Sequence, residues 1–76
     1  MLYETALEYI KSRIVDGSYA PGQQLPSVSA LAAEVGVGIS TVREAIRILE
    51  SLGLLRVLQG RGVFVTALPR LAENPL

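Results

Sequence analysis

The chain has 76 residues, half of them hydrophobic, a length that allows one small domain and a composition that supplies enough apolar side chains for a core. Seven basic residues balance seven acidic ones at pH 7, so the overall charge does not by itself indicate a nucleic-acid-binding protein. Because the sequence contains neither cysteine nor histidine, it lacks disulfides, thiolate nucleophiles, imidazole bases and the common zinc ligands, and we expect no enzyme, no metal and no cofactor.

The opening segment predicts a first helix. Its apolar residues recur at helical spacing on one face, from Tyr3 through Leu7 and Ile10 to Ile14. Gly17 follows this stripe and is a typical left-handed stop at the end of a helix. We therefore expect a helix of about 13 residues, followed by a connector that begins near Ser18.

The connector predicts a turn and a short extended segment. Ala20-Pro21-Gly22-Gln23 suits a type II turn, because proline fixes φ at the second position and glycine supplies a positive φ at the third. A short edge strand is expected at residues 23–25, and Pro26 prevents it from extending further.

A second, short helix is predicted to begin after Ser27, whose hydroxyl suits the N-cap position. The acidic partner of a complete capping box is missing, because position 30 is Ala30. A narrow apolar stripe follows the cap, and Gly36 ends the helix; the stripe consists of Val28, Leu31, Ala32 and Val35.

The third helix is predicted for residues 39–52, after the glycine turn at residues 36–38. Apolar residues between Val42 and Leu49 recur at i, i+3, i+4 and i+7, which is the spacing of one buried stripe. At about 100° per residue the opposite side carries hydroxyls and charges, namely Ser40, Arg43, Glu44, Arg47 and Ser51. A helix, a tight glycine turn and a helix with a polar, partly basic outer face together indicate a helix-turn-helix.

Two β-prone runs follow, at residues 54–58 and 63–66, and the glycine-bearing segment 59–62 is expected to form the tip of a hairpin between them. The predicted fold is mainly α with a small β-hairpin: a winged helix-turn-helix of three helices plus a wing, over residues 1–66. Residues 67–76 contain two prolines and no sustained periodicity, so we interpret them as a linker or the start of a further C-terminal domain.

Several separated motifs, in this order, resemble the N-terminal domain of GntR-family bacterial transcription regulators. They are Leu25-Pro26-Ser27, Leu31-Ala32, Thr41-Val42-Arg43-Glu44-Ala45-Ile46 and Gln59-Gly60-Arg61-Gly62-Val63-Phe64-Val65. The resemblance covers about residues 2–66. It implies a winged-helix reader of double-stranded DNA, a homodimer on a two-fold-symmetric (palindromic) operator, and a C-terminal domain that binds a small-molecule effector or dimerises.

Two segments depart from the family's pattern. Val28-Ser29 stand where the family usually has Glu-Arg, and Val37-Gly38-Ile39 stand where the turn into the third helix is usually Val-Ser-Arg. Two arginines that the family uses against DNA are therefore absent, which implies weaker binding with a flatter salt dependence. For Ile39 we favour packing at the border of the buried stripe; contact with a thymine methyl group in the major groove is the alternative.

The outer face of the third helix carries residues that we expect to contact DNA. Arg43 and Arg47 lie one turn apart there, although surface arginines are commonly only solvated or paired with an acid, here Glu44, Glu50 or Glu73. Ser40 and Thr41 fall in the first turn, where backbone N–H groups favour a phosphate, and capping of the helix is an alternative role for both.

Two further contacts with DNA are expected outside this helix. The glycines of Gly60-Arg61-Gly62 permit close approach to a sugar-phosphate wall, and Arg61 between them suits a narrow minor groove; a tight turn with no ligand is the alternative. Ser29 suits either a phosphate or local capping of the second helix. Residues 35–66 hold four basic and two acidic residues, so the half of the chain with the expected contacts is the positive half.

The functional prediction is sequence-specific DNA binding by the reader domain of a ligand-responsive transcriptional regulator. A winged-helix module for protein interaction or dimerisation is the alternative, favoured by the zero net charge and the two absent arginines. The N-terminus lacks the features of a signal peptide and no apolar run is long enough to span a bilayer, so we expect a cytoplasmic protein with no membrane partner.

Overall fold

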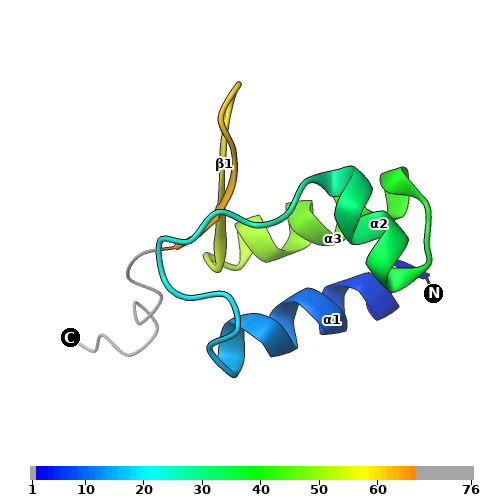
Figure 1. Cartoon of the computed structure of the whole chain (residues 1–76), viewed down its shortest axis with the longest axis horizontal. Helices are drawn as coiled ribbons and strands as arrows, with labels where there is room; N and C mark the ends of the chain where they lie inside the picture. Colours follow the sequence, from blue (N-terminus) through cyan, green and yellow to red (C-terminus); the bar gives the residue numbers. More distant parts are fainter. Residues whose placement is uncertain (1, 67–76) are drawn as a thin grey trace.

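The computed structural model describes residues 2–66, which form three helices and a two-stranded antiparallel sheet. In chain order these elements are α1 (Leu2–Val15), α2 (Val28–Val35), α3 (Ile39–Ser51), β1 (Leu55–Leu58) and β2 (Gly62–Val65). The helices pack together and the β1–β2 hairpin stands out from them as a wing (Figure 1). The predicted winged helix-turn-helix is thus confirmed, whereas the linker expected at residues 67–76 lies outside the described residues.

The centre of the core is α3, because every apolar residue of its predicted stripe is buried. Helix α1 contributes Ile10 and α2 contributes Leu31, both with no exposed surface. The base of the wing closes the core with Leu55 and Val65, which are paired across the two strands. One face of α3 is therefore held from three sides, and its other face is left to solvent.

The segment between α1 and α2 ties the wing to the helices. The predicted type II turn is confirmed, since the Gln23 N–H donates to the Ala20 carbonyl at 2.9 Å and Gly22 has φ of 84°. The expected edge strand is a single bridge between Gln24 and Phe64 of β2. Two hydrogen bonds, one on either side of the bridge, hold this segment along β2. The Leu25 N–H donates to the Val63 carbonyl at 2.8 Å, and the Val65 N–H donates to the Gln23 carbonyl at 2.9 Å.

Local signals set both ends of α2. The Ser27 hydroxyl accepts a hydrogen bond from the Ala30 N–H at 3.1 Å, which confirms the predicted N-cap. Gly36 follows the helix with φ of 84°, in the left-handed region that a C-terminal stop requires. The short turn that follows brings α2 and α3 together as the helix-turn-helix pair.

A small polar cluster joins α1 to α2. The Tyr9 hydroxyl donates to Glu34 Oε1 at 2.9 Å, and the Arg13 guanidinium lies 4.6 Å from the centre of the Tyr9 ring. Burial, together with the nearby Glu34 charge, raises the pKa of the Tyr19 hydroxyl. Within residues 2–66, no helix is long and apolar enough to cross a membrane.

Candidate nucleic-acid interface

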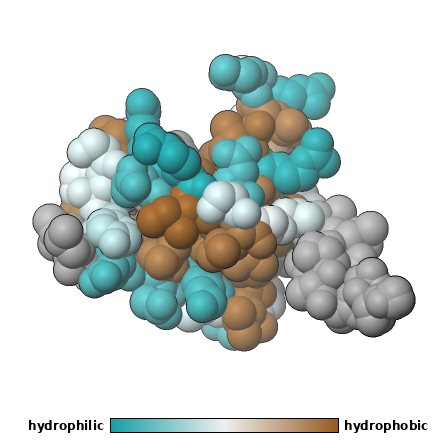
Figure 2. All heavy atoms as spheres, turned by 180° about the vertical axis from the view of Figure 1, so that it is seen from behind, coloured by the Kyte–Doolittle hydropathy of each residue, from teal (hydrophilic) through white to brown (hydrophobic). Residues whose placement is uncertain are grey.

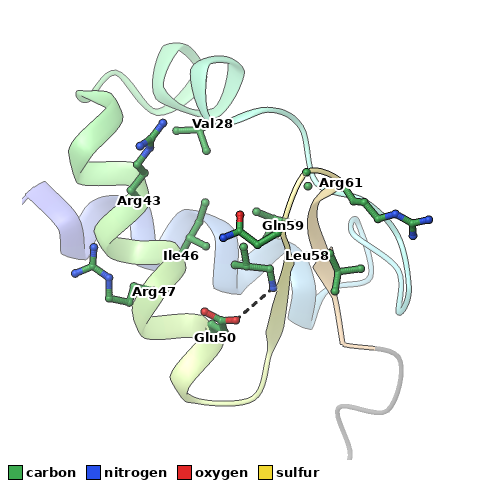
Figure 3. A pocket seen from close by; sticks show the side chains of 12 residues that line it. Val28, Arg43, Ile46, Arg47, Glu50, Leu58, Gln59 and Arg61 are labelled. Carbon is green, nitrogen blue, oxygen red and sulfur yellow. Dashed lines mark hydrogen bonds between the residues drawn. The ribbon is translucent and has the colours of Figure 1, made fainter.

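A hollow of about 630 Å³ lies between the exposed face of α3 and the wing (Figure 3). One wall comes from α3, the other from both strands and the tip of the wing, and the start of α2 closes one end. We call this feature the α3–wing hollow; its lining residues are Val28, Arg43, Ile46, Arg47, Glu50, Val57, Leu58, Gln59, Gly60, Arg61, Gly62 and Val63. Figure 2 shows the wing from behind, rising above the body with hydrophilic atoms at its tip.

The two arginines predicted on α3 both reach the α3–wing hollow. Arg43 is exposed and extends toward Val28 at the start of α2 (Figure 3). Arg47 forms an ion pair with Glu44, with Nη1 3.0 Å from Oε1, so the pairing considered from the sequence is confirmed for this residue. Because the Arg47 side chain is 72% exposed, this pair is a weak one that a stronger anion can displace.

The hydroxyl groups predicted near the helix starts are not used for capping. Gly38 is the N-cap of α3 and supplies no side-chain bond, so the capping role considered for Ser40 and Thr41 is wrong. The N-cap of α2 is Ser27, so the same alternative is wrong for Ser29. Within residues 2–66 these three hydroxyls make no side-chain hydrogen bond, and their hydrogen-bonding groups are available to a ligand.

The tip of the wing is a three-residue turn in which the Arg61 N–H donates to the Leu58 carbonyl at 2.9 Å and Gly60 has φ of 73°. Figure 3 shows the Arg61 side chain pointing away from α3, although Arg61 is among the residues that line the α3–wing hollow. The Gln59 side chain points into the hollow instead. The tip of the wing therefore shares the α3–wing hollow with Arg43, whereas the Arg61 side chain is directed away from α3.

Glu50 places a carboxylate in the α3–wing hollow, whereas from the sequence it was considered only as a pairing partner for the arginines of α3. Its Oε2 accepts a hydrogen bond from the Val57 N–H at 3.3 Å, which joins α3 to β1 (Figure 3). Helix α3 therefore contributes two positive charges to the lining of the hollow, from Arg43 and Arg47, and one negative charge, from Glu50. The i+7 spacing from Arg43 to Glu50 places both on one face of the helix, a signal that the sequence already contains.

Gly62 is required at the point where the wing meets the connector. Its φ is 130°, and a Cβ atom there would collide with the side-chain amide of Gln24. That amide donates from Nε2 to the Arg61 carbonyl at 3.0 Å, so an added methyl group would push the end of the exposed Gln24 side chain aside, and we expect this bond to be lost.

We expect Gly62→Ala to lower the free energy of unfolding by about 2–3 kcal/mol, because backbone strain adds to the lost Gln24 bond. Gly60→Ala is a matched control, since Gly60 also has a positive φ but has open space where the added methyl group would lie. Urea denaturation followed by circular dichroism gives both values. Equal losses for the two variants would show that the Gln24 contact is unimportant.

The helix-turn-helix pair α2–α3, with a hairpin beside the exposed face of α3, defines the class of protein: this is a winged helix-turn-helix domain. The family model described as bacterial regulatory proteins, gntR family, matches residues 2–65. The chain therefore belongs to the gntR family of bacterial regulatory proteins, and the resemblance noted in the sequence is confirmed.

Individual relatives agree with this assignment. The chain is 41% identical over 64 residues to the mannosyl-D-glycerate transport/metabolism system repressor MngR of Escherichia coli (strain K12), covering 84% of this chain and 27% of MngR. It is 38% identical over 65 residues to the HTH-type transcriptional repressor NagR of Bacillus subtilis (strain 168), covering 86% of this chain and 27% of NagR. The chain thus spans about a quarter of the length of these two curated relatives.

Among solved structures, the fold is similar to that of AraR(DBD) in complex with operator ORX1. The TM-score is 0.83 at 39% sequence identity, and the match covers 87% of this chain and 80% of that one.

Proposed function

We propose that residues 1–66 are the DNA-reading domain of a ligand-responsive transcriptional regulator. The α3–wing hollow supports this most directly, because it sets the exposed arginine face of α3 beside a protruding hairpin. An α-helix fits the major groove of B-DNA, and a wing beside it reaches a neighbouring groove. The similarity to AraR(DBD), a domain whose structure holds an operator, adds independent support.

In this proposal each expected contact has a distinct role. Arg43 reads a base edge in the major groove, since an arginine suits the acceptors of guanine. Ser29, Ser40 and Thr41 contact phosphates with their free hydroxyls, and Arg47 exchanges Glu44 for a phosphate. The tip of the wing, Gly60-Arg61-Gly62, approaches the minor groove. The Arg61 side chain points away from α3, and this direction favours its insertion into that groove.

The rest of the regulator is also part of the proposal. The two relatives described above are several times longer than this chain, which supports an interpretation of residues 67–76 as a linker toward a C-terminal effector or dimerisation domain. Two copies of the reader then occupy the halves of a palindromic operator in the cytoplasm. In this proposal the domain itself has no catalytic role.

Selection from a random duplex pool, followed by fluorescence anisotropy at about 50 and 200 mM salt, tests the proposal. We expect one enriched motif and an affinity that falls as salt rises, because phosphate contacts release counterions; the two absent arginines make this fall shallower than in relatives that keep them. Failure to enrich any sequence, with no binding at low salt, would instead support the protein-interaction alternative.

Glu50→Gln is expected to tighten DNA binding about threefold, because it removes a negative charge from the α3–wing hollow. The glutamine oxygen still accepts the Val57 hydrogen bond, so the position of β1 is kept. Glu8→Gln is the matched control, since it changes the net charge equally from an exposed site on α1. Anisotropy at low salt measures both; equal gains would mean that only overall charge matters.

A further inference from the structure

Ile39 is an exposed apolar residue at the start of the helix that faces the hollow. It is the first residue of α3, and 45% of its surface is exposed. It belongs neither to the buried core cluster nor to the partly buried residues that pack against that cluster. The packing at the border of the core that we favoured from the sequence is therefore wrong, and the side chain needs another explanation.

The helical repeat places Ile39 on the face of α3 that lines the α3–wing hollow. Arg43, Ile46 and Glu50 follow Ile39 by four, seven and eleven residues, and all three line the hollow. Ile39 therefore extends this face by one turn, beyond Arg43, at the N-terminal end of α3. In a recognition helix the N-terminal residues are those that reach the base edges.

The chemistry of Ile39 limits what it can recognise there. A branched hydrocarbon side chain neither donates nor accepts a hydrogen bond, so it cannot pair with the polar base edges of guanine, cytosine or adenine or with a phosphate. The C5-methyl group of thymine is the apolar group that the major groove displays. When the Ile39 side chain lies against this methyl group, the contact removes both apolar groups from water.

We propose that Ile39 is a specificity-determining residue that selects a thymine in each half of the operator by contact with its methyl group. This inference rests on the DNA-reading function proposed above. Arg43, one turn away on the same face, reads a neighbouring base pair. Burial of one methyl group corresponds to about a fourfold change in affinity, which sets the size of the expected effect.

The test uses the 76-residue chain and the duplex that it enriches from a random pool. Thymines of that duplex are replaced one at a time by deoxyuridine, which removes only the methyl group, and affinities are measured by fluorescence anisotropy. For the unmodified chain we expect one replacement in each half-site to weaken binding about fourfold. Ile39→Ala should bind the thymine and deoxyuridine duplexes equally, whereas Ile39→Val should retain most of the difference.

Leu52→Ala is the matched control, because Leu52 is an exposed apolar residue at the other end of α3 and does not line the hollow. It should leave the thymine-to-deoxyuridine ratio unchanged, and thermal melting should confirm that each variant folds. Salt-sensitive binding with no methyl dependence, or a dependence that Ile39→Ala leaves intact, overturns this inference alone. Absence of any DNA binding overturns the proposed function as well.

Discussion

Arg43→Ala is expected to weaken binding to the enriched duplex by about tenfold or more, through the loss of a base contact. Arg43 is exposed on the wall of the α3–wing hollow, and its side chain makes no hydrogen bond or ion pair within residues 2–66. Its removal therefore leaves no buried partner unsatisfied, and the domain should melt at the same temperature. Anisotropy with the enriched duplex and with a scrambled duplex separates lost affinity from lost specificity.

The matched control for Arg43 is Lys11→Ala, which removes the same charge from an exposed position on α1. Helix α1 lies across the body from the tip of the wing (Figure 1), so this variant should bind almost normally. A loss restricted to the enriched duplex would identify a base contact for Arg43. Equal losses for the Lys11 and Arg43 variants would contradict the interface proposed above.

Leu49→Ala is expected to lower the free energy of unfolding by about 2–5 kcal/mol, the range for truncation of a fully buried leucine. Leu49 has no exposed surface and belongs to the core cluster that joins the helices to the base of the wing. Natural domains have total stabilities of only about 5–15 kcal/mol, so this single change should remove a large share of the total. Urea denaturation followed by circular dichroism measures the loss.

Leu52→Ala is the matched control for Leu49, because it makes the same substitution three residues further along the chain at a position that is 58% exposed. Its effect should stay within about 0.5 kcal/mol, as for most surface changes. If both variants lost stability equally, the assignment of the buried stripe of α3 would be wrong.

The features that the sequence predicted correctly are those that neighbouring residues determine. The Ser27 cap depends on an N–H three residues away, and the turn at Pro21-Gly22 depends on the φ angles of those two residues. The stripe of α3 follows from the helical repeat alone, which is why its burial was predicted residue by residue.

The features that were missed depend on how separate elements meet. The direction of the Arg61 side chain follows from the register of the wing, in which Leu58 pairs with Gly62. That register leaves Gln59, and not Arg61, facing α3. The exposure of Ile39 depends on where the other elements end, and helical spacing placed it only near the border of the core.

The connector between α1 and α2 has a consequence for how the wing meets its target. Residues 22–25 are hydrogen-bonded along β2, opposite the edge that pairs with β1, so β2 has a neighbour on both of its edges near the base of the wing. The Gln24 amide extends this support to the tip through the Arg61 carbonyl. Moving the hairpin away from the connector would break these bonds together. We therefore expect the wing to keep its position before contact with a partner, so that little ordering entropy is lost on binding.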